Sequence, residues 1–243
     1  MKKLGTVIRY ECVTSFKYIW IFYAIEYAVV AAVFVLSYIT NGSSGKIGTN
    51  GLEFNSFIYV GILGILGFKE DFKMLIQNGF TRKYIFLSTF SLFAFISGIM
   101  SLVDTILGNV LHHWFHGYHS LFGGLYGYGH SYFLGWVWLF FVYMLICCLF
   151  YLVILIINKI GKKKSVYAGI TLGLTIILII PALIKFVLPK DLTDRIAAFG
   201  LKAFGFMTDG TINFMYPVFI FVLAACILNL CSYCVIRKTE LKA

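Results

Sequence analysis

The stretch YFLGWVWLFFVYMLICCLFYLVILII, residues 132–157, decides the fold class because it contains no charged side chain. A helix crosses the hydrocarbon core of a bilayer with roughly 20 apolar residues, and this run is longer than that. Uninterrupted apolar runs of such length are typical of membrane spans, whereas surface helices of soluble proteins keep one polar face. The stretch therefore predicts a transmembrane helix.

The rest of the chain has the same character. Of its 243 residues, 60% are apolar or aromatic and only 12% are charged, and the mean hydropathy is +0.90. Soluble domains carry about 45–50% apolar and about 25% charged residues. Six apolar runs are predicted to be spans: residues 18–40, 54–68, 84–111, 132–157, 166–188 and 214–236. The short loops leave no room for a sizeable soluble domain, so residues 1–243 are predicted to form one all-α integral membrane domain.

The second and fifth runs have distinctive features. Residues 54–68 form a short run that must borrow flanking residues or sit inside a bundle. Its small residues Gly61, Gly64 and Gly67 recur every three positions, which predicts close packing against another helix. Pro181 lies inside the fifth run and is expected to kink it.

The distribution of Lys and Arg predicts the orientation. If the N-terminus is cytoplasmic, fifteen of the twenty basic residues fall on the cytoplasmic side. Such a bias is the positive-inside signal, so both termini are predicted to be cytoplasmic. The same residues account for the net charge of +10, since they meet anionic lipid heads, and no nucleic-acid partner is expected.

The N-terminal segment, residues 1–17, mixes apolar and basic side chains. Leu4, Val7 and Ile8 recur at spacings of three and four, which places them on one side of a helix. We expect an interfacial helix over residues 1–17 that lies on the inner membrane surface and then turns into the first span.

The segment between the second and third runs, residues 68–83, is predicted to contain a short cytoplasmic helix. Phe72, Leu75 and Ile76 recur at helical spacing among charged residues. Asn78 and Gly79 form a typical helix stop, and the helix is expected to lie parallel to the membrane. An ordinary interfacial helix would show the same periodicity, so the pattern alone leaves the role of this helix open.

In its topology and in this segment the sequence resembles the permease subunits of ABC-2-type ATP-driven transporters, above all those of bacterial phenol-soluble modulin (toxin peptide) exporters. The segment that carries the likeness ends in Gln77-Asn78-Gly79-Phe80-Thr81-Arg82-Lys83. In that family the corresponding helix is a coupling helix that docks into a groove on the ATPase subunit. The resemblance implies an ATPase-binding surface formed by Phe68, Phe72, Lys73, Leu75, Ile76, Gln77 and Arg82.

The chain has no phosphate-binding loop of its own. Gly161-Lys162-Lys163-Lys164-Ser165 lacks the first glycine and the preceding strand of that motif. The resemblance therefore implies a non-catalytic subunit without a cofactor, with ATP and Mg bound by a separate ATPase chain and with two permease chains paired as a homodimer or heterodimer.

The function implied by the resemblance is export of amphipathic or hydrophobic peptides, a virulence activity, from the bacterial cytoplasmic membrane. Three alternatives stay open at this level: a permease for self-immunity to antimicrobial peptides, a metal-dependent intramembrane enzyme, and the substrate-capturing subunit of a vitamin importer. The last would have six spans but no docking helix.

Two acids lie within predicted spans, Glu26 in the first and Asp104 in the third. An ionisable group in hydrocarbon costs at least about 2.5 kcal/mol, so each is expected to face the bundle interior or a wet cavity. Both are predicted to line the substrate pathway, where they would contact the cationic part of a substrate. The alternative is a structural role with hydrogen bonds to residues such as Tyr23, Tyr27 or Ser101.

Two outer segments complete the set of predictions. All five histidines lie between the third and fourth runs, and His112 and His116 have a spacing that suits zinc. The lack of a nearby carboxylate favours a polar outer loop over a metal site. Residues 189–210 show helical amphipathicity and predict a short helix on the outer surface.

Overall fold

The computed structural model describes residues 2–41, 51–69, 71–114, 118–186, 188–207 and 209–237. Its helices are α1 (Lys2–Asn41), α2 (Glu53–Lys69), α3 (Asp71–Gln77), α4 (Arg82–Trp114), α5 (Leu121–Tyr126), α6 (Tyr132–Ile160), α7 (Lys162–Leu174), α8 (Ile180–Phe186), α9 (Lys190–Ala203) and α10 (Met215–Arg237), with a π-helical turn (Thr175–Ile179) between α7 and α8. Apart from one antiparallel bridge between Phe206 and Ile212, the described part has helices as its only regular structure, which confirms the all-α part of the predicted fold class.

Five helical segments of the described part are long and apolar enough to cross a membrane: Leu4–Thr40, Arg82–Trp114, Tyr132–Ile160, Lys162–Ile184 and Met215–Arg237. The second predicted span corresponds to α2, whose apolar part, Glu53–Gly67, is shorter. The chain is therefore a multi-pass membrane protein.

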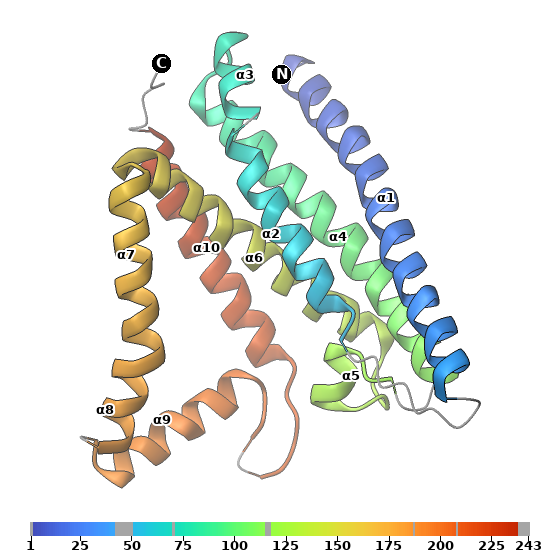
Figure 1. Cartoon of the computed structure of the whole chain (residues 1–243). Coiled ribbons are helices and arrows are strands. Elements are labelled where there is room, and N and C mark those ends of the chain that lie inside the picture. Colours follow the sequence, from blue (N-terminus) through green and yellow to red (C-terminus); the bar gives the residue numbers. More distant parts are fainter. Residues whose placement is uncertain are drawn as a thin grey trace.

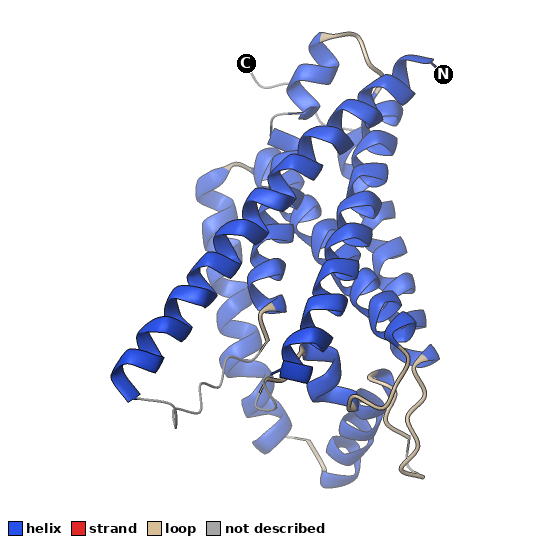
Figure 2. Ribbon diagram, turned by 90° about the vertical axis from the view of Figure 1, so that its right-hand side faces the viewer, coloured by secondary structure: helices blue, strands red, loops and turns tan. Residues whose placement is uncertain are grey.

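The helices run up and down between two ends of an elongated bundle (Figure 1, Figure 2). The N-terminal end of α1, the short helix α3 and the C-terminal end of α10 lie at one end, here called the α3 end. Helices α5 and α9 lie at the opposite end, here called the α5 end. At the α3 end the Arg82 guanidinium donates a hydrogen bond to the backbone oxygen of Arg237, which ties the start of α4 to the end of α10.

The glycines of α2 allow this short helix to sit inside the bundle. A Cβ atom on Gly64 would lie 2.8 Å from the backbone oxygen of Cys147 on α6, closer than carbon and oxygen can approach. Gly61 faces Phe150 of the same helix, and Gly67 faces Phe93 of α4. The predicted close packing through these glycines is confirmed, and the partner helices belong to this chain.

Helices α4 and α6 contribute most of the buried core. Phe93 and Tyr151 pack edge to face, with ring centroids 5.5 Å apart, and both are almost completely buried. Large buried aromatic rings supply extensive contact area with few rotatable bonds. These buried contacts therefore hold α4 and α6 together at the centre of the bundle, and the outer helices pack against this pair.

Two long helices differ from the pattern expected from sequence. Helix α1 continues without a break through residue 17, so the described structure does not separate the predicted interfacial helix 1–17 from the first span. The segment holds no proline that would end a helix there. Before Pro181, the backbone forms the π-helical turn, and the N–H of Ile180 bonds to Thr175 O, five residues back. Such a turn lets the helix continue although Pro181 has no backbone N–H to donate to the preceding turn.

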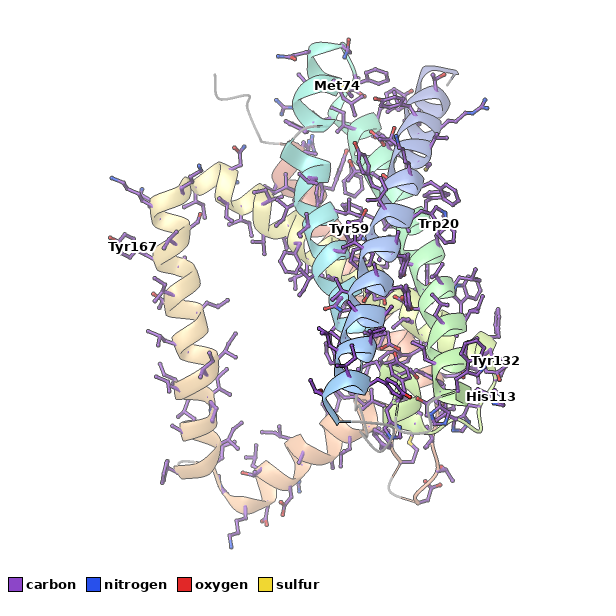
Figure 3. All side chains as sticks on the ribbon, turned by 45° about the vertical axis from the view of Figure 1, so that its right-hand side comes forward. Trp20, Tyr59, Met74, His113, Tyr132 and Tyr167 are labelled. Carbon is purple, nitrogen blue, oxygen red and sulfur yellow. The ribbon has the colours of Figure 1, made fainter. Side chains whose placement is uncertain are left out.

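Helices α7, α8 and α9 form an arm that packs little against the rest of the molecule. None of their residues whose side chains the structure describes is buried. Figure 3 shows Tyr167 of α7 pointing away from the bundle, and 71% of its surface is exposed. The outer helix predicted within residues 189–210 is present as α9, with its apolar residues Leu192, Ile196 and Phe199 exposed.

Candidate functional site

The first candidate site is α3 and the turn that follows it. The seven residues of α3 end where Gly79 adopts a left-handed backbone conformation, with φ of +76°. The N–H of Phe80 then bonds to the backbone oxygen of Leu75, and the N–H of Gly79 bonds to that of Ile76. These two hydrogen bonds together form a Schellman motif, which fixes the direction in which the chain leaves a helix. A short helix is therefore present and ends at Asn78-Gly79, as the sequence pattern predicts, and its cytoplasmic position stays a prediction.

The faces of α3 are divided between the bundle and solvent. Phe72 and Leu75 are each only 2% exposed and belong to the core, and Ile76 is half-buried against it. Met74, labelled in Figure 3, is 41% exposed. Gln77 is exposed as well. Phe72 and Leu75 therefore anchor α3 to the bundle, and a partner protein would meet Met74 and Gln77 first.

The predicted ATPase-binding residues also include Phe68, Lys73 and Arg82. The side chains of Phe68 and Lys73 lie outside the described residues. Arg82 is engaged with the backbone of Arg237, as described above. This bond gives Arg82 a role in closing the α3 end of the bundle, and leaves its part in partner binding as a prediction.

The second candidate site surrounds Asp104, which is 6% exposed in the middle of the bundle. The Tyr23 hydroxyl of α1 donates to Asp104 Oδ1 at 2.8 Å, and the Tyr143 hydroxyl of α6 donates to Asp104 Oδ2. The buried Ser56 side chain of α2 lies beside the same carboxyl group. One carboxyl group thus joins α1, α4 and α6, which is a structural role, and Tyr23 is one of the partners that sequence reasoning named.

Glu26 lies in a different environment. Its side chain is 8% exposed, and its Oε1 accepts a hydrogen bond of 3.1 Å from the Asn55 side-chain amide of α2. Unlike Asp104, it also lines a surface groove between α1 and α2. Of the two acids predicted to meet substrate, Glu26 is the one that a ligand can reach from outside the bundle.

A third buried acid, Glu53, was not singled out from the sequence. It is 4% exposed at the start of α2, and its Oε1 accepts a hydrogen bond from the backbone N–H of Leu121. Its other oxygen is buried without a hydrogen-bond partner among the described residues. Glu26, Glu53 and Asp104 interact electrostatically, so three acidic side chains lie near one another in the α5 half of the bundle. Sequence reasoning missed Glu53 because it directly precedes the second apolar run, a position where charged loop residues are common.

The histidine-rich segment forms an aromatic cap at the α5 end. The His112 ring stacks on Tyr128 with centroids 3.4 Å apart, and its Nδ1 lies 2.8 Å from the backbone oxygen of Tyr118. Burial raises the pKa of the Tyr118 hydroxyl, and the nearby Glu53 carboxylate raises this pKa further, so Tyr118 is neutral at physiological pH. Residues 115–117, including His116, lie outside the described part, and within that part no three His, Cys, Asp or Glu side chains form a metal-binding group.

Comparison of the sequence and the structure with protein-family models, curated proteins and solved structures gave no match.

Proposed function

We propose that this chain is the membrane-spanning permease subunit of an ABC-2-type exporter in a bacterial cytoplasmic membrane, and that it moves amphipathic or hydrophobic peptides outward. ATP is bound and hydrolysed, with Mg, by a separate cytoplasmic ATPase subunit. The carrying observation is α3, a short helix at one end of the bundle, anchored by Phe72 and Leu75 and closed by a Schellman turn. A rigidly held helix with an exposed face can pass on the movement of a docked partner.

The topology in this proposal has six crossings. Helix α2 is short, yet its glycines pack it between α4 and α6, where surrounding protein reduces its contact with lipid. Counting α2 with the five longer segments brings the N-terminal end of α1 and the C-terminal end of α10 to the same side. The basic residues of the α3 turn and of the turn between α6 and α7 lie on that side too, which supports a cytoplasmic α3 end.

The substrate class and the pairing of two permease chains follow from the resemblance given by residues 68–83. The groove beside Glu26 supports an amphipathic substrate, because it combines apolar walls with one carboxyl group. A permease for self-immunity to antimicrobial peptides would use the same architecture and would differ in the peptide that it moves.

The test is co-purification of the ATPase with the permease from its native membrane in mild detergent. Phe72 is unsuitable for substitution because a charge at this buried position would unfold α3. The informative variant is Met74→Glu combined with Gln77→Glu, which changes only exposed side chains. We expect an ATPase to co-purify with the unaltered chain and to be lost from the double variant.

The matched control is Ile160→Glu, at the turn between α6 and α7, where the side chain is 49% exposed. This variant carries a new charge near the same end of the bundle but away from α3, so it should retain the ATPase. Absence of any ATPase from the unaltered complex would contradict the ABC assignment. Retention of the ATPase by the double variant would contradict α3 as its docking helix.

A further inference from the structure

A surface groove between α1 and α2 combines apolar walls with one buried acidic side chain. Its volume is about 390 Å³. The α1/α2 groove is lined by Phe22, Ile25, Glu26, Val29, Val30, Asn55, Ile58, Tyr59 and Ile62. Figure 3 marks Tyr59 on α2 and Trp20 on α1, the two helices that form its sides.

The groove exists because its two helices pack on different partners. Helix α1 rests on α4, whereas α2 rests mainly on α6, so α1 and α2 meet at only a few places. One of these places is the stack of Phe22 on Tyr59, with ring centroids 4.4 Å apart and planes tilted by 18°. A second is the hydrogen bond from Asn55 to Glu26. Between these contacts, the aliphatic side chains of Ile25 and Ile58 are more than half exposed.

The charge in the groove has one sign. Glu26 is its only ionisable carboxyl group, and no Lys, Arg or His is among the lining residues. In the described part of the molecule, Glu26 has one hydrogen-bond donor, Asn55, and forms no ion pair. The two other buried acids, Glu53 and Asp104, lie close enough to interact electrostatically with it. A buried carboxylate without a cation favours a ligand that brings one.

We propose that the α1/α2 groove binds a molecule with an apolar chain and a primary ammonium group, with the ammonium on Glu26 and the chain along Ile25, Val29 and Ile58. An ammonium group carries three donors and can bond the carboxyl oxygen that Asn55 leaves accessible. The walls lie on the lipid-facing surface of the bundle, so such a ligand enters from within the membrane. As a site for the exported peptide, the groove rests on the proposed function; as a binding site it does not.

The test uses the permease alone, without ATPase, in phosphatidylcholine nanodiscs. Radiolabelled dodecylamine, a cation at neutral pH, is compared with radiolabelled dodecanol, which has the same chain and no charge. Empty nanodiscs give the partitioning into lipid, which is subtracted. We expect saturable binding of dodecylamine, about tenfold tighter than binding of dodecanol, because only the ammonium group can form a charge-assisted hydrogen bond with Glu26.

Two variants separate the charge from the walls. Glu26→Gln keeps an oxygen for the Asn55 bond and removes the negative charge, and we expect dodecylamine to bind about tenfold more weakly, as dodecanol does. Ile58→Trp fills the groove, and both ligands should be lost. The matched control is Ile177→Trp on the π-helical turn beside α7, where the isoleucine is 70% exposed and Ile58 is 65% exposed. This control should bind like the unaltered protein.

Three results would overturn the proposal: equal affinity for dodecylamine and dodecanol, full affinity in Glu26→Gln, or full affinity in Ile58→Trp. Displacement of dodecylamine by phosphatidylethanolamine at a few per cent of the lipid would support the ammonium site but assign it to a lipid headgroup, and it would remove the groove as a site for the exported peptide. Failure of the ATPase co-purification, by contrast, would remove the exporter assignment and leave this binding measurement unaffected.

Discussion

Helix α4 and the segment formed by α7 and α8 are both apolar enough to cross a membrane, yet they have opposite environments. Half of the most apolar stretch of α4 is buried inside the chain, whereas none of the corresponding stretch within residues 162–184 is buried. In Figure 1, α4 runs through the bundle, whereas α7 stands apart from it. Apolar composition therefore decides that a helix enters the membrane, but it does not decide whether protein or lipid surrounds it.

Small and polar side chains account for the difference. On α4, Ser97, Ser101 and Asp104 are buried; the Ser101 hydroxyl bonds back to Gly98 of its own helix, whereas Asp104 is bonded to α1 and α6. On the arm, the hydroxyls of Thr171 and Thr175 bond back to carbonyls of their own helix, four residues earlier. Since lipid tails are as apolar as Leu and Ile, only close packing and interhelical hydrogen bonds hold membrane helices together. Within the described residues, α4 has such contacts and the arm does not.

The largest effect is expected from removing the polar contact at the centre of the bundle. Asp104→Leu leaves the buried Tyr143 hydroxyl without its acceptor, while Tyr23 retains the backbone oxygen of Met100. An orphaned buried hydroxyl costs about 1–3 kcal/mol, and the interhelical bonds are lost as well, so we expect a loss of about 2–4 kcal/mol in the free energy of unfolding. Detergent-induced unfolding of the purified protein, followed by circular dichroism, measures this.

The control for this substitution is Asp104→Asn, which keeps one oxygen acceptor in the same place. It should lose less than half as much stability as Asp104→Leu. Equal losses would mean that shape, and not hydrogen bonding, is the property of Asp104 on which the bundle depends. No loss from either variant would contradict the contrast drawn between α4 and the arm.

A smaller effect is expected where α2 meets α6. In Gly64→Ala the new Cβ would lie 2.8 Å from the Cys147 backbone oxygen, so the helices must move apart. Overpacking of this kind costs about 1–3 kcal/mol, reduced by the better helix propensity of alanine. The unfolding assay measures the change. Stability equal to that of the unaltered protein would show that α2 is not held as closely against α6 as its glycines indicate.

Sequence reasoning predicted the features that depend on local pattern. The all-helical membrane fold follows from apolar runs, the end of α3 from Asn78-Gly79, and the close packing of α2 from its glycines. Each of these depends on residues near one another in the chain, because helix length and turn conformation are local properties.

The features that sequence reasoning missed depend on contacts between distant segments. Spacing in α3 marks Phe72 and Leu75 as one apolar face but does not say whether that face meets a partner or the chain's own bundle. Asn55 and Glu53 lie at the start of a span, where polar residues are common, and only the fold brings Asn55 to Glu26. The splayed position of α7 is likewise invisible in its composition, since lipid and protein surroundings demand similar residues.

The smallest effect, and the sharpest test of the contrast, is expected on the arm. A Cβ atom on Gly173 of α7 would meet nothing within 4 Å, so Gly173→Ala introduces no clash. Alanine is favoured over glycine in a helix by up to about 1 kcal/mol, so the variant should be as stable as the unaltered protein or slightly more stable. The measurement is the same unfolding assay, made in detergent and again in nanodiscs with Gly64→Ala alongside. If Gly173→Ala loses stability in nanodiscs only, α7 packs against another helix in the membrane, and the contrast with α4 applies to the isolated chain and not to the assembled protein.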